Sequence, residues 1–384
     1  MEKVLAFEKI DMNSSNLVIQ ARDFCSRWKG RFFSSDAVSA LRKTDILSHM
    51  VDRQKLPYEI YRSSFELLHE IGKVDIAAAV GLTMHQYALG TIATAEIFDE
   101  ESRQKRDYFL KMIQDEKLLC AVSSFDMTIQ SDGRIKAGLN AVMVDGRWVV
   151  TGRKRYQSMA SIADILFFTA AISDHSFGLF YVVLKDNPNI AFDTTPPVAF
   201  LQETDTRAIN FDQVSIAPYQ LVSVADITAT TQFHAYSLSW FQSLISAAYL
   251  GAARAALEVC IRKIATVGSG DSVLKHESAV GRMELQLRSA LSLRYAVESV
   301  LVEASHNSPA VAMREFSVAA EVLKYTGTQV ASSIVSQIRH LGGLSMMVDE
   351  SSFGRISEYV LYGAMHPRSN SDLESSSGRS ALSR

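Results

Sequence analysis

The sequence lacks most of the short motifs that identify a particular chemistry. Its 384 residues contain no GxGxxG pattern, no P-loop, no GxSxG elbow and no HExxH zinc motif. The nine histidines show no metal-ligand spacing with cysteine or carboxylate residues. The glycine-rich run at 268–271 follows no clear strand, so we interpret it as a loop. A prediction of function therefore depends on longer segments and on their order along the chain.

The sequence also has few cysteines and a small net charge. Cys25, Cys120 and Cys260 lie far apart and form no CxxC pair, which is typical of a reducing cytoplasm. The net charge of −3 gives no strong field toward nucleic acid or an anionic membrane. The first residues lack the apolar segment of a secretory signal. We therefore expect a cytoplasmic protein that binds no nucleic acid.

The most apolar long stretch spans residues 238–257. It contains Gln242, several serines and Arg254, which favours a buried helix over a membrane span. Within it, Ala247, Ala248 and Gly251 share one helical face with two further alanines, so a partner helix can approach closely. We expect no membrane span.

The spacing of apolar residues changes twice along the chain. Residues 1–117 show helical spacing and residues 227–384 show it again, ending in a serine-rich tail that we expect to be mobile. Between them, residues 118–226 contain strand-like runs, and Asp145-Gly146 suits a tight hairpin. The order predicts an α+β fold with an N-terminal helical domain, a central β domain and a C-terminal helical domain.

Four segments in a definite order narrow this prediction. Each is weak alone, but together they resemble the acyl-CoA dehydrogenase superfamily over most of the chain. The segments are residues 96–118, 148–164, 209–218 and 341–343. The resemblance implies a β-barrel-like central domain and a C-terminal four-helix bundle. It also implies a flavin-dependent oxidoreductase, assembled as a homodimer or homotetramer, that works with an electron-transfer partner or a flavin reductase.

The second segment carries the most chemistry that the resemblance implies. It fits the superfamily pattern with Gly152, Lys154, Tyr156 and Ser158, followed by Ala163-Asp164. In the superfamily the aromatic residue lies beside the isoalloxazine and the hydroxyl lies near flavin N5. An aromatic wall and a hydrogen-bond partner suit a flat ring that takes up hydride.

Other parts of the expected cofactor site are less faithful to the superfamily. Ser124, Phe125 and Ser131 fall near the segment whose backbone amides reach the pyrimidine edge of the flavin. Gly342-Gly343 resembles the double glycine that lies close to phosphate and ribose. Arg339 stands where relatives have Gln. It can replace the missing arginine that binds the diphosphate in relatives. The resemblance implies FAD rather than FMN.

The catalytic carboxylate of the superfamily is missing from both of its usual positions. In most members a Glu follows a segment that corresponds to residues 353–359, and this position falls near His366-Pro367. A minority carry the Glu on the first long C-terminal helix, where this chain has Phe241. Trp240 and Phe241 are expected to line an aromatic substrate pocket. His366 is the remaining candidate for the catalytic residue.

Three interpretations remain open. First, the chain is a specialised dehydrogenase that oxidises an acyl thioester on CoA or a carrier protein, with His366 or a carboxylate from elsewhere as base. Second, it is a monooxygenase of the same superfamily, which uses reduced flavin and oxygen and needs no α-proton base. Third, the fold is kept for binding without redox turnover. Because both glutamates are absent, ordinary fatty-acid β-oxidation is less consistent with this site than a specialised reaction.

Overall fold

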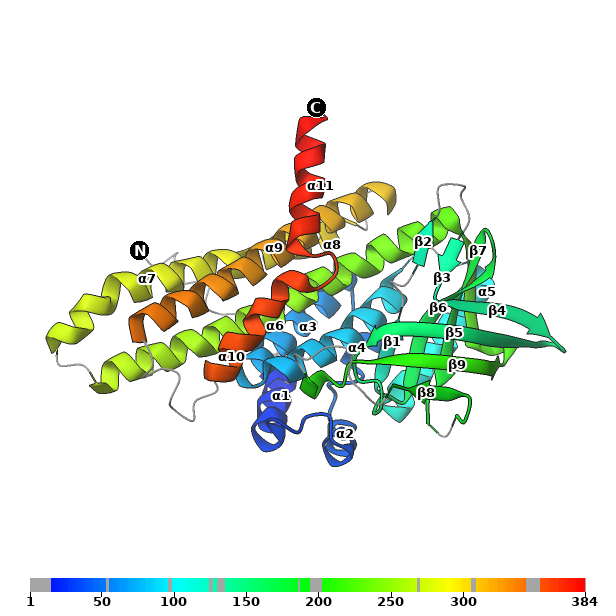
Figure 1. Ribbon diagram of the computed structural model, residues 1–384, viewed down its shortest axis with the longest axis horizontal. Helices are drawn as coiled ribbons and strands as arrows, with labels where there is room; N and C mark the ends of the chain where they lie inside the picture. Colours follow the sequence, from blue (N-terminus) through cyan, green and yellow to red (C-terminus); the bar gives the residue numbers. More distant parts are fainter. Residues whose placement is uncertain are drawn as a thin grey trace.

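The computed structural model describes residues 15–52, 55–95, 99–123, 127–129, 135–185, 187–193, 202–267, 270–304, 309–342 and 353–383. Helices come first in the chain, a block of strands follows, and helices return (Figure 1). The helices form an elongated bundle and the strands lie together at one end of it. The predicted α+β fold class is confirmed.

The first helical block is built from elements with clear start signals. Pro57 opens α3, and the Asp75 side chain accepts a hydrogen bond from the Ala78 amide at the start of α4. Asp99 caps α5 in the same way. The elements are α1 (Ser15–Trp28), α2 (Ser35–Leu41), the 3-10 helix η2 (His49–Val51), α3 (Pro57–Val74), α4 (Ile76–Thr94) and α5 (Glu100–Glu116).

The strands form one large sheet and a small separate ribbon. The large sheet runs β10-β7-β6-β4-β5-β9-β8, with β1 parallel to β6, and β2 pairs with β3. The strands are β1 (Cys120–Ser123), β2 (Met127–Ile129), β3 (Ile135–Ala137), β4 (Leu139–Val144), β5 (Arg147–Gln157), β6 (Ile165–Ser173), β7 (Ser176–Val183), β8 (Ile190–Phe192), β9 (Arg207–Ile216) and β10 (Leu221–Asp226). Short 3-10 turns η3 (Gln202–Thr204) and η4 (Pro218–Gln220) flank β9.

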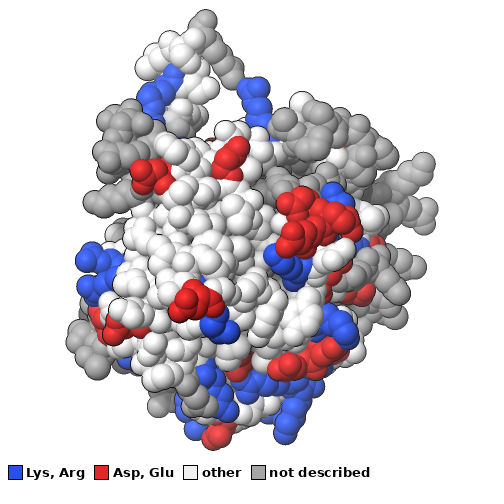
Figure 2. Space-filling view, turned by 90° about the vertical axis from the view of Figure 1, so that its right-hand side faces the viewer, with Lys and Arg blue, Asp and Glu red and all other residues white. Residues whose placement is uncertain are grey.

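The predicted hairpin at Asp145-Gly146 joins β4 to β5. Both residues have positive φ, +49° and +77°, as a tight two-residue turn requires. Helix α5 covers the sheet through Phe109, whose ring lies 5.6 Å from Phe167 and 4.9 Å from Tyr181. At this end of the molecule, basic and acidic side chains are mixed around a largely uncharged centre (Figure 2).

The large sheet curls so that strands distant in its order meet. Trp148 on β5 lies 5.7 Å from Phe180 on β7, ring centre to ring centre. Phe168 on β6 lies 5.2 Å from Phe211 on β9. Two strands separate each of these pairs in the sheet order, so aromatic side chains fill the inside of the curve.

The second helical block is organised around one long helix. Its elements are α6 (Ile227–Val267), α7 (Gly270–Ser292), α8 (Arg294–Glu303), α9 (Pro309–Gly342), α10 (Phe353–Tyr359), the 3-10 helix η6 (Val360–Met365) and α11 (Asn370–Leu382). The serine-rich tail forms helix α11, and its mobility stays a prediction. Ser369 and Asp372 cap α11 reciprocally, and their spacing was a start signal that the serine-rich composition obscured. Helix α11 projects away from the bundle (Figure 1).

Helix α6 is the apolar stretch noted in the sequence. By length and composition it is the one described helix that could cross a membrane, but 78% of its most apolar window is buried inside the molecule. Its small-residue face meets α3. A Cβ atom added at Gly251 would lie 2.1 Å from the His69 carbonyl oxygen, and one added at Gly72 would lie 2.4 Å from that of Ala248. The predicted close approach of a partner helix is confirmed.

The three cysteines are all buried and free. Burial raises the pKa of the Cys120 thiol to about 12 and also raises the pKa values of Cys25 and Cys260. Buried thiols of this kind carry little thiolate at neutral pH.

The close packing of α6 on α3 predicts a sharp difference between two glycine substitutions. Gly251→Ala should lower the free energy of unfolding by roughly 1–3 kcal/mol, because the methyl group overlaps backbone of α3. Gly281→Ala, on α7, has open space around the new Cβ and should be neutral or stabilising by up to about 1 kcal/mol. Urea unfolding of both variants checks this; equal midpoints would contradict it.

Candidate functional site

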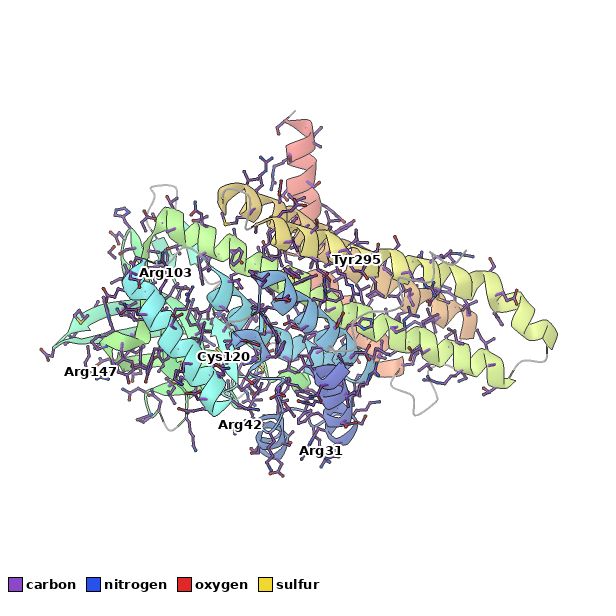
Figure 3. All side chains as sticks on the ribbon, turned by 180° about the vertical axis from the view of Figure 1, so that it is seen from behind. Arg31, Arg42, Arg103, Cys120, Arg147 and Tyr295 are labelled. Carbon is purple, nitrogen blue, oxygen red and sulfur yellow. The ribbon has the colours of Figure 1, made fainter. Side chains whose placement is uncertain are left out.

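The motif glycine and aspartate have structural reasons to be present. Gly152 has φ +136°, and a Cβ there would lie 2.2 Å from the carbonyl oxygen of Gly138. Asp164 binds Arg42, the C-cap residue of α2, at 2.5 Å and accepts a hydrogen bond of 2.8 Å from the Leu119 amide. Asp164 therefore fastens the start of β1 to the N-terminal helices, at the junction where Figure 3 labels Arg42 and Cys120.

Tyr156 lies on an irregular part of β5. The register between β5 and β9 shifts between Lys154 and Gln157, and Tyr156 has φ +63°. A bulge of this kind redirects side chains, and the Tyr156 side chain is 65% exposed. The exposed ring can form one wall of a binding site for a flat molecule.

Ser158 is buried, and its hydroxyl group begins a short chain of hydroxyls. Ser158 Oγ lies 2.9 Å from Thr206 Oγ1, which lies 2.8 Å from Thr204 Oγ1. The neighbouring Gln157 side chain is also buried, and its Oε1 has no hydrogen-bond partner among the described residues. This amide oxygen is a candidate acceptor for a bound ligand.

Helix α10 connects the Ser158 loop to Arg339. Glu203, next to Thr204, accepts a hydrogen bond from the Tyr359 hydroxyl and faces Arg355. On the same short helix, Ser357 accepts hydrogen bonds from Arg339. Nε donates to Ser357 Oγ at 2.8 Å, and Nη2 donates to the Ser357 carbonyl oxygen at 3.0 Å. Ser158 and Arg339 thus belong to one network, although they are predicted to meet different parts of the cofactor.

His366 lies in a turn between η6 and α11 and packs against α6. Its Nε2 shares a 2.8 Å hydrogen bond with the Tyr249 hydroxyl. Its ring lies 6.0 Å from the ring of Phe241, which in turn lies 5.2 Å from Tyr87 on α4. Burial, followed by the charge of Lys324, lowers the pKa of His366 to about 4, so the imidazole is neutral at pH 7.

Trp240 and Phe241 differ in their surroundings. Trp240 is fully buried and packs edge-on against Tyr61 and Phe316, with ring centres 6.2 Å and 5.9 Å away. Trp240 is thus part of the core, and its place in a substrate pocket stays a prediction. Phe241 is also buried, but its ring reaches His366.

Several predicted cofactor-binding positions lie outside the described residues. These are Ser124, Phe125, Ser131 and Gly343. Gly342 is the last residue of α9. Their part in a cofactor site stays a prediction, as does the division into three domains at 117 and 226.

Comparisons with known proteins were made for sequence and for fold. No protein-family model matches the sequence. The putative acyl-CoA dehydrogenase YdbM of Bacillus subtilis (strain 168) is 24% identical over 227 residues, 57% of this chain and 57% of YdbM. The match therefore spans less than two thirds of that relative.

Two solved structures show the same fold at low sequence identity. Butyryl-CoA dehydrogenase from Megasphaera elsdenii has a TM-score of 0.77, with 14% identity over 97% of this chain and 99% of its own. FMN-bound TdsC from Paenibacillus sp. A11-2 has a TM-score of 0.76, with 14% identity over 91% of this chain and 93% of its own. These two structures show that the chain has the acyl-CoA dehydrogenase fold, and the sequence similarity to YdbM points the same way.

The two positions that the sequence predicts for a base lie next to each other in this fold. Phe241 comes from α6 and His366 from the turn before α11, yet their rings are in contact. A base at either position could therefore reach the same bound substrate. In this chain these positions have the apolar ring of Phe241 and the neutral imidazole of His366.

Sequence reasoning missed Tyr249 and Glu203. Tyr249 is a single tyrosine within a run of small and aliphatic residues on α6, and a large polar-tipped side chain in such a run is a usable signal. Glu203 has no comparable signal, because its partners on α10 lie about 150 residues away in the sequence.

Three surface hollows lie elsewhere on the molecule. Their volumes are about 350, 420 and 600 Å³, and their linings include His49, His69 and Arg106 respectively. None of these three is lined by Phe241, Tyr249 or His366. Within the described residues, no cluster of three or more His, Cys, Asp or Glu side chains could hold a metal ion.

Asp164 should matter far more for stability than an exposed acidic residue does. Asp164→Ala removes an ion pair and leaves the Leu119 amide without its carboxylate partner, and should cost roughly 2–3 kcal/mol. Asp115→Ala breaks only an exposed i,i+4 pair with Lys111 and should cost under about 0.5 kcal/mol. Thermal unfolding compares the two, and a similar loss in both would contradict the junction described for Asp164.

Proposed function

We propose that this chain is a flavin-dependent oxidoreductase whose reaction centre lies at Phe241, Tyr249 and His366. The observation that carries the proposal is the contact between Phe241 and His366. These residues occupy the two positions from which superfamily members supply their base. Their meeting supports one reaction centre, in which the usual carboxylate is replaced by His366 hydrogen-bonded to Tyr249.

The described residues fit a flavin. Tyr156 offers an exposed ring as a wall for the isoalloxazine, while Ser158 and the unpartnered Gln157 Oε1 offer polar groups for its edge. Arg339 uses Nε and Nη2 on Ser357, which leaves Nη1 for a phosphate oxygen. A bound flavin would supply the redox chemistry, either by taking hydride from substrate or by reacting with oxygen once reduced.

The state of His366 favours the oxygen-using reaction. A base whose pKa is about 4 is poorly matched to removing an α-proton from an acyl thioester at neutral pH. A neutral imidazole is better suited to donating a hydrogen bond. If Tyr249 donates to Nε2, the ring proton lies on Nδ1, which has no partner among the described residues. We infer a monooxygenase that uses Nδ1–H to stabilise negative charge on oxygen.

The second candidate is oxidation of an acyl thioester bound to CoA or a carrier protein. It is favoured by the sequence similarity to YdbM, a putative acyl-CoA dehydrogenase. Under this reading, substrate binding must raise the basicity of His366 or bring a carboxylate from another part of the assembly. A homodimer or homotetramer, a cytoplasmic location, and a reductase or electron-transfer partner also remain part of the proposal.

Absorption spectroscopy and oxygen uptake separate these reactions. The purified protein with added FAD or FMN is first reduced by a flavin reductase and NADH, then exposed to oxygen with candidate aromatic or carrier-bound substrates. Substrate-dependent oxygen uptake supports the monooxygenase. Anaerobic bleaching of oxidised flavin by an acyl thioester would instead establish the dehydrogenase. Absence of flavin binding in both redox states would reject both and leave a binding protein.

Tyr156→Ala tests the proposed flavin wall. Loss of the ring should weaken flavin binding roughly tenfold, as about 1.4 kcal/mol of lost aromatic contact predicts. Tyr219→Ala, another exposed tyrosine, should leave the affinity unchanged. Fluorescence titration with flavin compares the variants. Equal affinities for Tyr156→Ala and the wild type would overturn this placement of the isoalloxazine.

His366→Gln tests the reaction centre separately from cofactor binding. Turnover should fall roughly 100-fold, in the range typical of losing one donor to developing negative charge, with flavin affinity unchanged. In the wild type a neutral Nε2 must accept the Tyr249 hydrogen bond that orients Nδ1–H, so the rate should be constant above about pH 5. It should fall as the pH drops through the His366 pKa of about 4. A His366→Gln enzyme with wild-type turnover would remove His366 from the mechanism.

A further inference from the structure

The turn that carries His366 is held from both sides by one buried lysine. Lys324 on α9 is fully buried. Its Nζ donates to the carbonyl oxygen of Arg368 at 2.9 Å and to Asn370 Oδ1 at 2.7 Å, and lies 3.5 Å from the carbonyl oxygen of Ala364. The backbone acceptors are each two residues from His366, one before it and one after it.

Neighbouring residues of α9 continue this attachment along one face of the helix. Thr328, one turn after Lys324, exchanges hydrogen bonds with the Asn370 side chain. Glu321, three residues before Lys324, pairs with Arg368 at 2.6 Å. The i, i+3 and i+7 spacing puts these three side chains on the same side of α9. The His366 turn is thus docked on α9 as well as on α6.

Lys324 is unusual within this set because its direct partners are uncharged oxygens. A buried ammonium without a carboxylate in contact is costly. Burial accordingly lowers the pKa of Lys324 to about 8, while the more distant Asp372 acts in the opposite direction. At pH 7 Lys324 is therefore mainly a cation. Its charge opposes protonation of His366 and adds to the effect of burial.

We propose that Lys324 is a positioning residue for His366, which fixes the His366 turn through the carbonyl groups of Ala364 and Arg368 and keeps the imidazole uncharged. This inference rests on the proposed function, in which a neutral His366 is the reacting group. Tyr249 faces His366 from α6, Lys324 and Glu321 lie on α9, Arg368 lies on its own segment, and Asp372 lies on α11. Of these groups, Lys324 has the charge that acts against an imidazolium.

Nuclear magnetic resonance of ring-labelled histidine tests the proposal without a cofactor. The His366 signal is assigned by its loss in His366→Gln, and its titration is followed in the full-length protein. Lys324→Met should move the His366 pKa upward by about one unit, because the like charge is gone. Lys324→Arg keeps the cation and should restore the wild-type value. Lys111→Met, which removes an exposed cation, should change nothing.

A second variant guards against simple misfolding. Lys324→Gln keeps hydrogen-bond donors but has no charge, so it should show the same upward shift with less loss of thermal stability than Lys324→Met. An unshifted His366 pKa in folded Lys324→Gln or Lys324→Met would overturn the proposal. A shift of equal size in Lys324→Arg would also overturn it, since that result would reflect disturbed packing and not charge.

Activity measurements separate this inference from the proposed function. If the chain is a flavin enzyme, the acidic limb of its pH–rate profile should move upward in Lys324→Gln by the same amount as the His366 titration. A His366 shift in a protein that has no flavin activity would support the electrostatic role of Lys324 and reject the proposed function. Flavin activity with an unmoved acidic limb and an unmoved titration would reject the role of Lys324 alone.

Discussion

The contact of α6 with α3 is the constraint on which the rest of the molecule depends. The two helices are so close that neither Gly72 nor Gly251 has room for a methyl group. This contact sets the rotation of α6 about its axis, and residues on its opposite side must then face α9, α10 and η6. Tyr249 is one of them, so the backbone packing of two helices determines where the His366 ring finds its hydrogen-bond partner.

Local sequence patterns predict the helices, strands and turns, whereas the candidate site is formed by contacts between residues far apart in the sequence. The Asp145-Gly146 turn, the small-residue face of α6 and the helix–strand–helix order follow from spacing and composition over a few residues. The Tyr249–His366 bond spans 117 residues and the contacts of Lys324 span 40 to 46, and no local pattern encodes such pairs. The bulge at Tyr156 could not be predicted, because the residues around Tyr156 in the sequence do not indicate a positive φ.

The structure changes the meaning of the missing carboxylate. From the sequence alone, the two absent glutamates leave a specialised dehydrogenase, a monooxygenase and a binding protein open. In the fold, the two predicted positions lie next to each other, and Phe241, His366 and Tyr249 form a connected arrangement there. An arrangement with its own hydrogen bonds and its own supporting lysine is consistent with a different reaction on a shared scaffold.

The burial of all three cysteines has a consequence for the oxygen-using reaction proposed above. Such enzymes release some hydrogen peroxide when a turnover fails, and peroxide attacks thiolates most readily. Cys25, Cys120 and Cys260 are buried as protonated thiols and are thereby protected. The exposed sulfur nearest to His366 in sequence is that of Met365, which is 64% exposed. Oxidation should therefore produce a sulfoxide at Met365, beside the proposed reaction centre, and not a lost thiol.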